Sequence, residues 1–114
     1  MNAEELKSRP RSFAVQIVEF VERTQKSKLT DVAGYQFIRS ATSVAANYRA
    51  VCRSRSRADF INKLGIVEEE ADETLFWLEL LVDCRKAQID DVKPLIDEAE
   101  QLTRIFSASR ITAK

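Results

Sequence analysis

Glycine and proline are almost absent from this sequence, which has two of each in 114 residues. A β-sandwich or β-barrel needs many tight turns, and these turns depend on Gly, Pro, Asn and Asp. Long helices with few connections need very little glycine or proline. The composition, 45% hydrophobic and 32% charged, is typical of a globular helical protein and excludes a disordered tail. The length fits a single domain spanning residues 1–114.

Histidine is absent, and the two cysteines, Cys52 and Cys84, do not form a C-x-x-C spacing. A zinc site built from side chains needs four ligands from Cys, His and carboxylates, and this sequence lacks that set. We therefore expect no metal ion and no cofactor. The two thiols favour a reducing cytoplasm, although they could also form one disulfide.

Long apolar runs are missing as well. No run approaches the roughly 20 residues that a membrane-spanning helix requires. Residues 1–11 also lack the apolar segment of a secretory signal. We therefore expect a cytoplasmic protein with no membrane partner.

Net charge is zero overall, but the two halves of the chain carry opposite charge. Residues 1–63 hold 12 Lys/Arg and 6 Asp/Glu, a net charge of +6, whereas residues 64–114 hold 6 Lys/Arg and 12 Asp/Glu, a net charge of −6. Antiparallel helices from the two halves would neutralise each other within one subunit or between subunits. The alternative is that the basic half forms a face for an anionic partner.

Apolar residues recur at helical spacing in four segments, over residues 9–26, 31–52, 56–86 and 90–107. The first segment has Pro10 near its start, where a missing N–H does no harm. The second is rich in small side chains, which favours a central position. The third holds an unbroken four-three spacing, the seam of a long helix, formed by Phe60, Leu64, Val67, Ala71, Thr74, Leu78 and Leu81.

The fourth segment has Asp90 or Asp91 as its expected cap, and its tail beyond Ser107 is expected to fray. Four helices joined by short connections predict an all-α fold, an antiparallel up-down-up-down four-helix bundle.

A polar stripe follows one face of residues 31–52, and a stripe on the next helix carries Glu70, Glu73 and Trp77. Two acids one helical turn apart would suit acid–base catalysis or a hard cation. We favour a structural role, in which Arg39 pairs with Glu70 or Glu73. The network that would fix the helix register is completed by Ser43 and Asn47. No nucleophile, histidine or Gly-rich loop accompanies the acids, so we expect no enzyme.

Four arginines fall within nine residues, and Lys63 follows them along the chain; the arginines are Arg49, Arg53, Arg55 and Arg57. Arginine and serine side chains bind phosphates without reading bases, which suggests contact with the backbone of RNA or DNA. Exposed connections between helices are often basic without such a role. A second hypothesis is a protein-interaction or scaffold module, in which these arginines pair with Glu98 or Glu100 of a neighbouring subunit.

Two stretches of the chain resemble the "four helix bundle protein" family, from Phe13 to about Phe106. The stretches are Arg39-Ser40-Ala41-Thr42-Ser43 with Asn47, and Glu70 with Glu73-Thr74-Leu75-Phe76-Trp77-Leu78; Ser56-Arg57-Ala58-Asp59-Phe60 adds to them. This family includes proteins encoded in intervening sequences of bacterial 23S ribosomal RNA genes, and accessory proteins of diversity-generating retroelements look like distant relatives. Many relatives carry an acid where this chain has Arg49.

The resemblance implies an up-down bundle that assembles as a ring-like homopentamer without enzymatic activity. It also implies nucleic-acid association, by analogy with the retroelement accessory proteins. No catalytic or ligand-binding residue is carried over. The family-pattern positions, with an expected structural role, are Arg39, Asn47, Glu70, Glu73 and Trp77.

Overall fold

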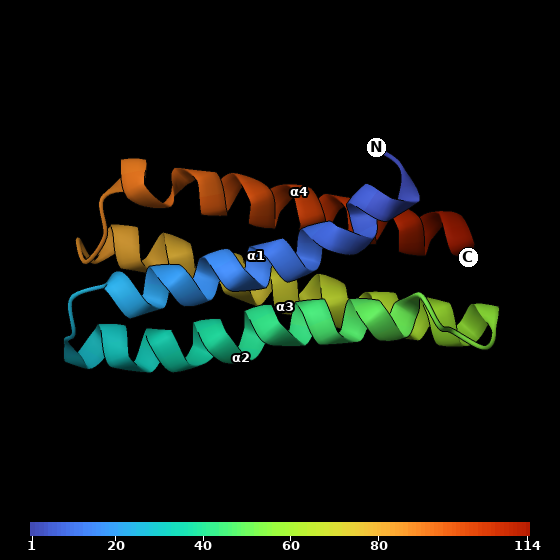
Figure 1. Cartoon of the computed structure of the whole chain (residues 1–114), viewed down its shortest axis with the longest axis horizontal. Helices are drawn as coiled ribbons and strands as arrows, with labels where there is room; N and C mark the ends of the chain where they lie inside the picture. Colours follow the sequence, from blue (N-terminus) through green and yellow to red (C-terminus); the bar gives the residue numbers. More distant parts are fainter.

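The computed structural model describes residues 1–114 as four α-helices without strands (Figure 1). Successive helices run in opposite directions, and both termini lie at the end of the molecule that also holds the second connection. The prediction of an all-α protein with four helices is confirmed. The helices are α1 (Ala3–Arg23), α2 (Lys28–Val51), α3 (Arg57–Asp83) and α4 (Ile89–Ala113).

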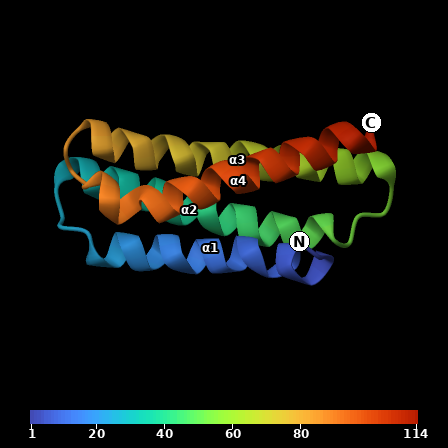
Figure 2. The ribbon, with the colours of Figure 1, turned by 90° about the horizontal axis from the view of Figure 1, so that it is seen from above.

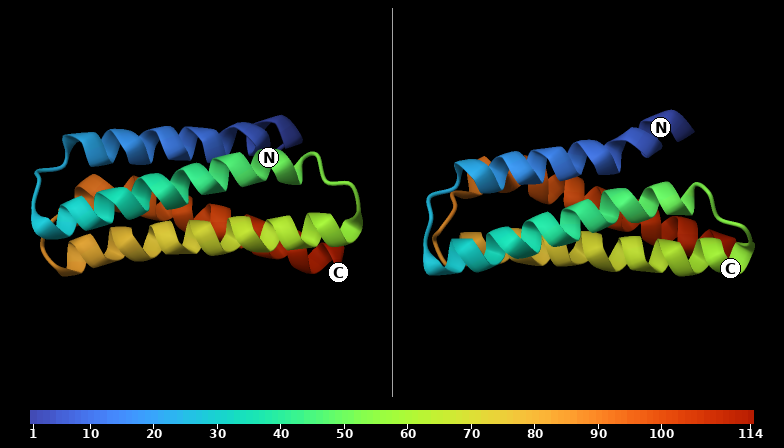
Figure 3. Two further views of the ribbon diagram at one scale, coloured as in Figure 1. Left: turned by 90° about the horizontal axis from the view of Figure 1, so that it is seen from below. Right: turned by 60° about the horizontal axis from the view of Figure 1, so that its bottom comes forward.

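The helices form a rod with principal extents of 44 × 23 × 21 Å. Each helix packs against its neighbours in the cycle α1–α2–α3–α4, and a smaller contact between α1 and α4 closes the cycle. The diagonal pairs, α1 with α3 and α2 with α4, lie across the bundle from each other (Figures 2 and 3). The α1–α2 face and the α3–α4 face are therefore on opposite sides of the rod.

All four helices contribute to one core of 20 buried hydrophobic residues. Its largest fully buried side chains include Phe13 of α1, Phe37 of α2 and Phe106 of α4. The seam expected on α3 is buried from Leu64 to Leu81, whereas Phe60 at its start is only half-buried. None of the four helices has an apolar stretch long enough to cross a lipid bilayer.

The first helix begins earlier than its apolar periodicity predicts. The side chain of Asn2 accepts a hydrogen bond from the Glu5 N–H at 2.8 Å and caps the helix, so that α1 starts at Ala3 rather than near residue 9. The prediction that Pro10 lies near the helix start was therefore wrong. Pro10 lies inside α1, where its buried ring leaves one backbone carbonyl without its usual partner.

The other helix ends also show local chemistry that periodicity does not detect. Ser27 and Thr30 form a capping box, so α2 starts at Lys28 rather than at residue 31. The N-cap of α4 is Gln88, with no side-chain hydrogen bond, and neither aspartate expected to cap this helix does so. Both aspartates lie in the first turn, where their negative charge interacts favourably with the helix dipole. The α4 helix continues to Ala113, so the expected fraying beyond Ser107 was wrong.

Candidate functional site

The α2–α3 connection is a short segment held by local hydrogen bonds. The Arg53 N–H donates to the Ala50 carbonyl at 3.0 Å, and the Ser54 hydroxyl donates to the Val51 carbonyl at 2.7 Å. Ser56 then caps α3 by accepting from the Asp59 N–H at 3.0 Å. These bonds place the basic residues in a defined arrangement at one end of the rod.

Three of the five basic residues predicted here are exposed and make no ion pair with a carboxylate: Arg49, Arg53 and Arg55. The other two are engaged within the chain. Lys63 Nζ donates to Asp59 Oδ2 at 2.8 Å. The Arg57 guanidinium donates to backbone carbonyls at the end of α4. The candidate interface for an anion therefore rests on the three unpaired arginines.

A shallow depression lies over this connection, lined by Ala50, Arg53, Arg55, Ser56, Asp59 and Lys63. Residues 49–63 contain five cations and one acid, a net charge of +4. The hydrogen bond from Lys63 and the backbone N–H of Arg55 lower the pKa of Asp59, so this acid stays ionised and paired. An anion in the depression would meet two guanidinium groups that have no other partner.

The opposite end of the rod holds a second group of cations that sequence reasoning missed. The α1–α2 and α3–α4 connections meet there, and they bring Lys26 together with Arg85 and Lys86 around a polar depression. This group is balanced, because residues 83–91 contain three acids and two cations. Only the meeting of two connections distant in sequence creates it, so no local motif signals it.

The expected ion pair between α2 and α3 joins three charged side chains. Arg39 donates to Glu70 Oε2 at 3.0 Å and also to Glu73, and its Nε donates to Gln36 Oε1 at 3.1 Å. One guanidinium thus bridges both carboxylates that the sequence suggested as an acid pair. The arrangement holds the outer edge of α2 against α3.

The prediction that Ser43 and Asn47 complete this network was wrong. The Asn47 side chain donates to the Ser43 carbonyl and hydroxyl, both at 2.9 Å, and this local pair makes no hydrogen bond to Arg39. The interhelical hydroxyl contact is made by Ser40 and Thr74 instead. Of the expected network, the structure brings together only the guanidinium and the two acids.

Trp77 is half-buried against the core and contacts Phe76 edge-to-face, with 5.3 Å between ring centroids. Phe76 itself is 52% exposed. The tryptophan therefore belongs to the packing of α3, while its neighbour presents an aromatic ring to solvent.

The acids that the second hypothesis assigns to a neighbouring subunit are already paired within the chain. Arg9 Nε donates to Glu98 Oε2 at 3.0 Å, and this hydrogen bond raises the pKa of Arg9. Arg104 donates to Glu100 at 3.0 Å. Neither acid is left unpaired for an arginine of another copy.

The two cysteines are free and exposed at opposite ends of the rod. Cys52 follows α2, whereas Cys84 follows α3. A disulfide within one chain would need the two Cα atoms within about 7 Å. The alternative of an intrachain bridge is therefore excluded.

These features define a small all-α four-helix protein with one basic end. The model of the family described as "23S rRNA-intervening sequence protein" matches residues 5–108, and the chain belongs to this family. The chain is also similar to a solved structure from Bacteroides thetaiotaomicron, a protein of unknown function from the S23 ribosomal protein family. The two share 30% identity and a TM-score of 0.80, over 92% of this chain and 97% of the other. A comparison with curated protein sequences found no match.

Proposed function

We propose that the protein is a non-enzymatic, cytoplasmic homo-oligomer that associates with the backbone of RNA or DNA. The single observation that carries the nucleic-acid proposal is the set of exposed arginines without carboxylate partners, Arg49, Arg53 and Arg55. The free thiols support a reducing compartment. The likeness to the intervening-sequence family supports a role close to ribosomal RNA.

A ring-like homopentamer would raise the overall affinity for nucleic acid, which is low in a single subunit. Three arginines per subunit neutralise only a few phosphates, so the affinity of one subunit is low and strongly dependent on salt. Five copies of the same basic end on one assembly would bind one nucleic-acid strand with an effective concentration in the millimolar range, about 10² to 10⁴ times tighter overall. Assembly into a ring would therefore itself contribute to nucleic-acid binding.

Titration of a labelled single-stranded RNA at 50 and 200 mM salt tests the proposal. The parent protein is expected to lose affinity steeply with salt, and the variant with Arg49→Gln, Arg53→Gln and Arg55→Gln is expected to bind about tenfold or more weakly. A matched control removes three exposed charges that also make no ion pair with a carboxylate, through Lys28→Gln, Arg85→Gln and Lys86→Gln. Parental affinity in the first variant would overturn the proposed interface.

A second candidate is a scaffold that contacts only proteins. The exposed aromatic side chains Tyr35 and Phe76, 68% and 52% exposed, favour it, because aromatic residues are enriched at protein–protein interfaces. Light scattering of the triple-arginine variant separates the two functions. A loss of oligomer mass together with no RNA binding by the parent would support the scaffold.

A further inference from the structure

Two connections meet at the end of the rod opposite the α2–α3 connection (Figures 1 and 3). The α1–α2 and α3–α4 connections together line a polar depression with a volume of about 250 Å³. Its lining has three cations, no acid and no apolar residue: Gln25, Lys26, Ser27, Thr30, Arg85 and Lys86. All three cations are exposed, and none forms an ion pair with a carboxylate. An anion in this depression would therefore meet unpaired positive charge from both connections.

The acids of the α3–α4 connection do not line this depression. Residues 83–91 carry three acids and two cations, but Asp83 lines a depression on the α3–α4 face. Asp91 lines an adjoining depression together with Arg23. The polar depression and the adjoining one have four cations and one acid between them, a net charge of +3. The balanced charge of the connection in sequence therefore hides a local excess of positive charge.

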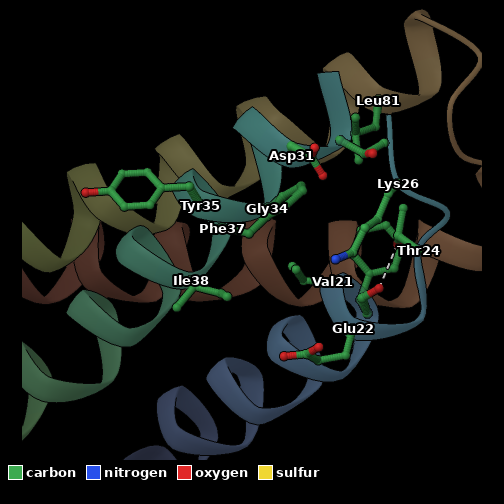
Figure 4. A pocket seen from close by; sticks show the side chains of 12 residues that line it. Val21, Glu22, Thr24, Lys26, Asp31, Gly34, Tyr35, Phe37, Ile38 and Leu81 are labelled. Carbon is green, nitrogen blue, oxygen red and sulfur yellow. Dashed lines mark hydrogen bonds between the residues drawn. The ribbon is translucent and has the colours of Figure 1, made fainter. Parts of the chain in front are cut away.

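Lys26 also lies beside two acids. Glu22 and Asp31 line the neighbouring pocket between α1 and α2, which Lys26 lines as well (Figure 4). Neither acid forms an ion pair with Lys26. Both acids still weaken the attraction of an anion to this lysine. The site therefore depends mainly on Arg85 and Lys86.

Arg85 stands where a glycine would fit the backbone better. Its φ of 59° is the only positive φ in the chain. The Lys86 N–H donates to the Leu81 carbonyl at 2.8 Å and the Arg85 N–H to the Val82 carbonyl at 3.0 Å, the pattern of a Schellman helix end. The left-handed residue of this motif is usually glycine, because a Cβ there crowds the backbone. Stability alone favours glycine at this position, which points to a role for the guanidinium itself.

The backbone is fixed on both sides of the depression. The Ser27 N–H donates to Thr30 Oγ1 at 2.7 Å, and the Thr30 N–H donates to Ser27 Oγ at 3.2 Å. This capping box holds Lys26 just before α2, as the Schellman turn holds Arg85 just after α3. Cations on a fixed backbone lose less entropy when they bind an anion, because only their side chains must be ordered.

We propose that this depression binds a compact phosphate group, either free phosphate or the end of a small phosphate ester. Arg85 supplies a planar pair of N–H donors that matches two phosphate oxygens, while Lys26 and Lys86 supply point charges. A volume of about 250 Å³ is below the roughly 300–1,000 Å³ of most small-molecule sites, which suits a phosphate group better than a whole nucleotide. The lining also has no aromatic ring on which a base could stack. The site goes beyond the proposed function and does not depend on it.

Calorimetric titration with inorganic phosphate at constant ionic strength tests the site. The parent should bind phosphate saturably, with a dissociation constant of about 1 mM or below. The variant with Lys28→Gln, Arg85→Gln and Lys86→Gln, which is the charge control for RNA binding, should bind phosphate about tenfold or more weakly. The variant with Arg49→Gln, Arg53→Gln and Arg55→Gln should bind phosphate as the parent does. The two triple variants therefore exchange the roles of test and control between the two ligands.

A parallel titration with glycerol 3-phosphate distinguishes the two sources of the phosphate group. Tighter binding of the ester than of inorganic phosphate indicates an ester as the ligand. Equal or weaker binding of the ester indicates free phosphate.

Arg85→Gly separates phosphate binding from a structural role of the arginine. Positive charge just after a helix also interacts favourably with the helix dipole. If that were its only role, Arg85→Gly would lower the thermal unfolding temperature and leave the affinity for phosphate unchanged. We expect the opposite: an unfolding temperature equal to the parent's or higher, because glycine adopts a positive φ without strain, and phosphate binding about tenfold weaker. Far-UV circular dichroism checks that every variant keeps its helices.

Three results would overturn the inference: no saturable phosphate binding by the parent, parental phosphate affinity in Arg85→Gly, or loss of phosphate binding in the triple variant at Arg49, Arg53 and Arg55. The third result would place the phosphate at the α2–α3 connection. None of the three decides whether RNA binds, since RNA affinity is measured separately. Equally, an absence of RNA binding would leave the phosphate site standing.

Discussion

The hydroxyls of Ser40 on α2 and Thr74 on α3 lie 2.7 Å apart, and both residues are completely buried. Thr74 Oγ1 also donates to the Glu70 carbonyl at 2.9 Å. Because the single Thr74 proton is used in that bond, Ser40 donates to Thr74. This is the one buried hydrogen bond between side chains of different helices, and it lies within an otherwise apolar seam.

We predict an asymmetric cost for removing the two hydroxyls. Ser40→Ala leaves Thr74 bonded to the backbone and should cost about 1 kcal/mol of unfolding free energy. Thr74→Val leaves the Ser40 hydroxyl buried without its acceptor and should cost about 1–3 kcal/mol. The double variant should recover much of that loss, since both polar groups are gone. Urea unfolding of the four proteins of the double-mutant cycle measures these differences, and additive costs would contradict the argument.

The bridge from Arg39 to Glu70 and Glu73 should contribute modestly to stability. The Arg39 side chain is 37% exposed, so solvent screens the pair. We expect Arg39→Ala to lower the unfolding free energy by about 1 kcal/mol, with a smaller effect at high salt. Arg104→Ala removes an exposed pair within one helix and serves as the control, with an expected cost of at most about 0.5 kcal/mol. Equal costs for the two variants would show that the bridge between helices adds nothing.

The last turns of α4 are held by a contact with α3. Arg110 Nε donates to Glu68 Oε2 at 2.8 Å, and this hydrogen bond raises the pKa of Arg110. We expect Arg110→Ala to speed amide hydrogen exchange in the last turns of α4 and to leave exchange in the middle of the helix unchanged. Arg104→Ala, which breaks a contact within α4 alone, should leave the end of the helix as protected as in the parent. Unchanged exchange in Arg110→Ala would mean that the helix end is stable without Glu68.

Most of the fold follows from spacing, because a buried helix face repeats at a fixed interval. The buried seam of α3 from Leu64 to Leu81 was predicted from the spacing of its own residues alone. The beginning of α1 was not, since its first turn is polar and depends on the Asn2 cap. The end of α4 was missed for a different reason, which is that its partner Glu68 lies 42 positions away.

In the candidate interface too, features formed by residues close in sequence were predicted, whereas features formed by tertiary contacts were missed. The arginines at the α2–α3 connection were found because they are close in sequence. Arg57 is not available to an anion because its guanidinium donates to backbone carbonyls at the end of α4. This contact is tertiary, and no local pattern in the sequence reveals it. The close packing of α1 on α2 at Gly34 is also tertiary, since a Cβ at Gly34 would lie only 3.1 Å from Val21 Cγ1.

Tyr48 gives a test of the packing beside the basic end. Burial, followed by the charge and hydrogen bond of Cys52, raises the pKa of Tyr48 from 10.0 to about 12. Its ring packs against Phe106, with 5.5 Å between centroids. A tyrosine with a raised pKa holds its proton more tightly in the folded chain. Protonated Tyr48 therefore adds to the free energy of unfolding below pH 10, and this contribution is lost as the pH rises from about 10 to 12.

The chain has two tyrosines, so Tyr35→Phe leaves Tyr48 as the only phenol. In that variant, the tyrosinate absorbance near 295 nm is expected to rise around pH 12 while the protein stays folded. It should rise near pH 10 in denaturant, where burial is lost. The fall in unfolding free energy between pH 10 and 12 should be smaller in Tyr48→Phe than in the parent, since the replaced ring cannot ionise. Titration of the folded variant near pH 10 would place the Tyr48 hydroxyl in water and contradict the packing described for the end of α2.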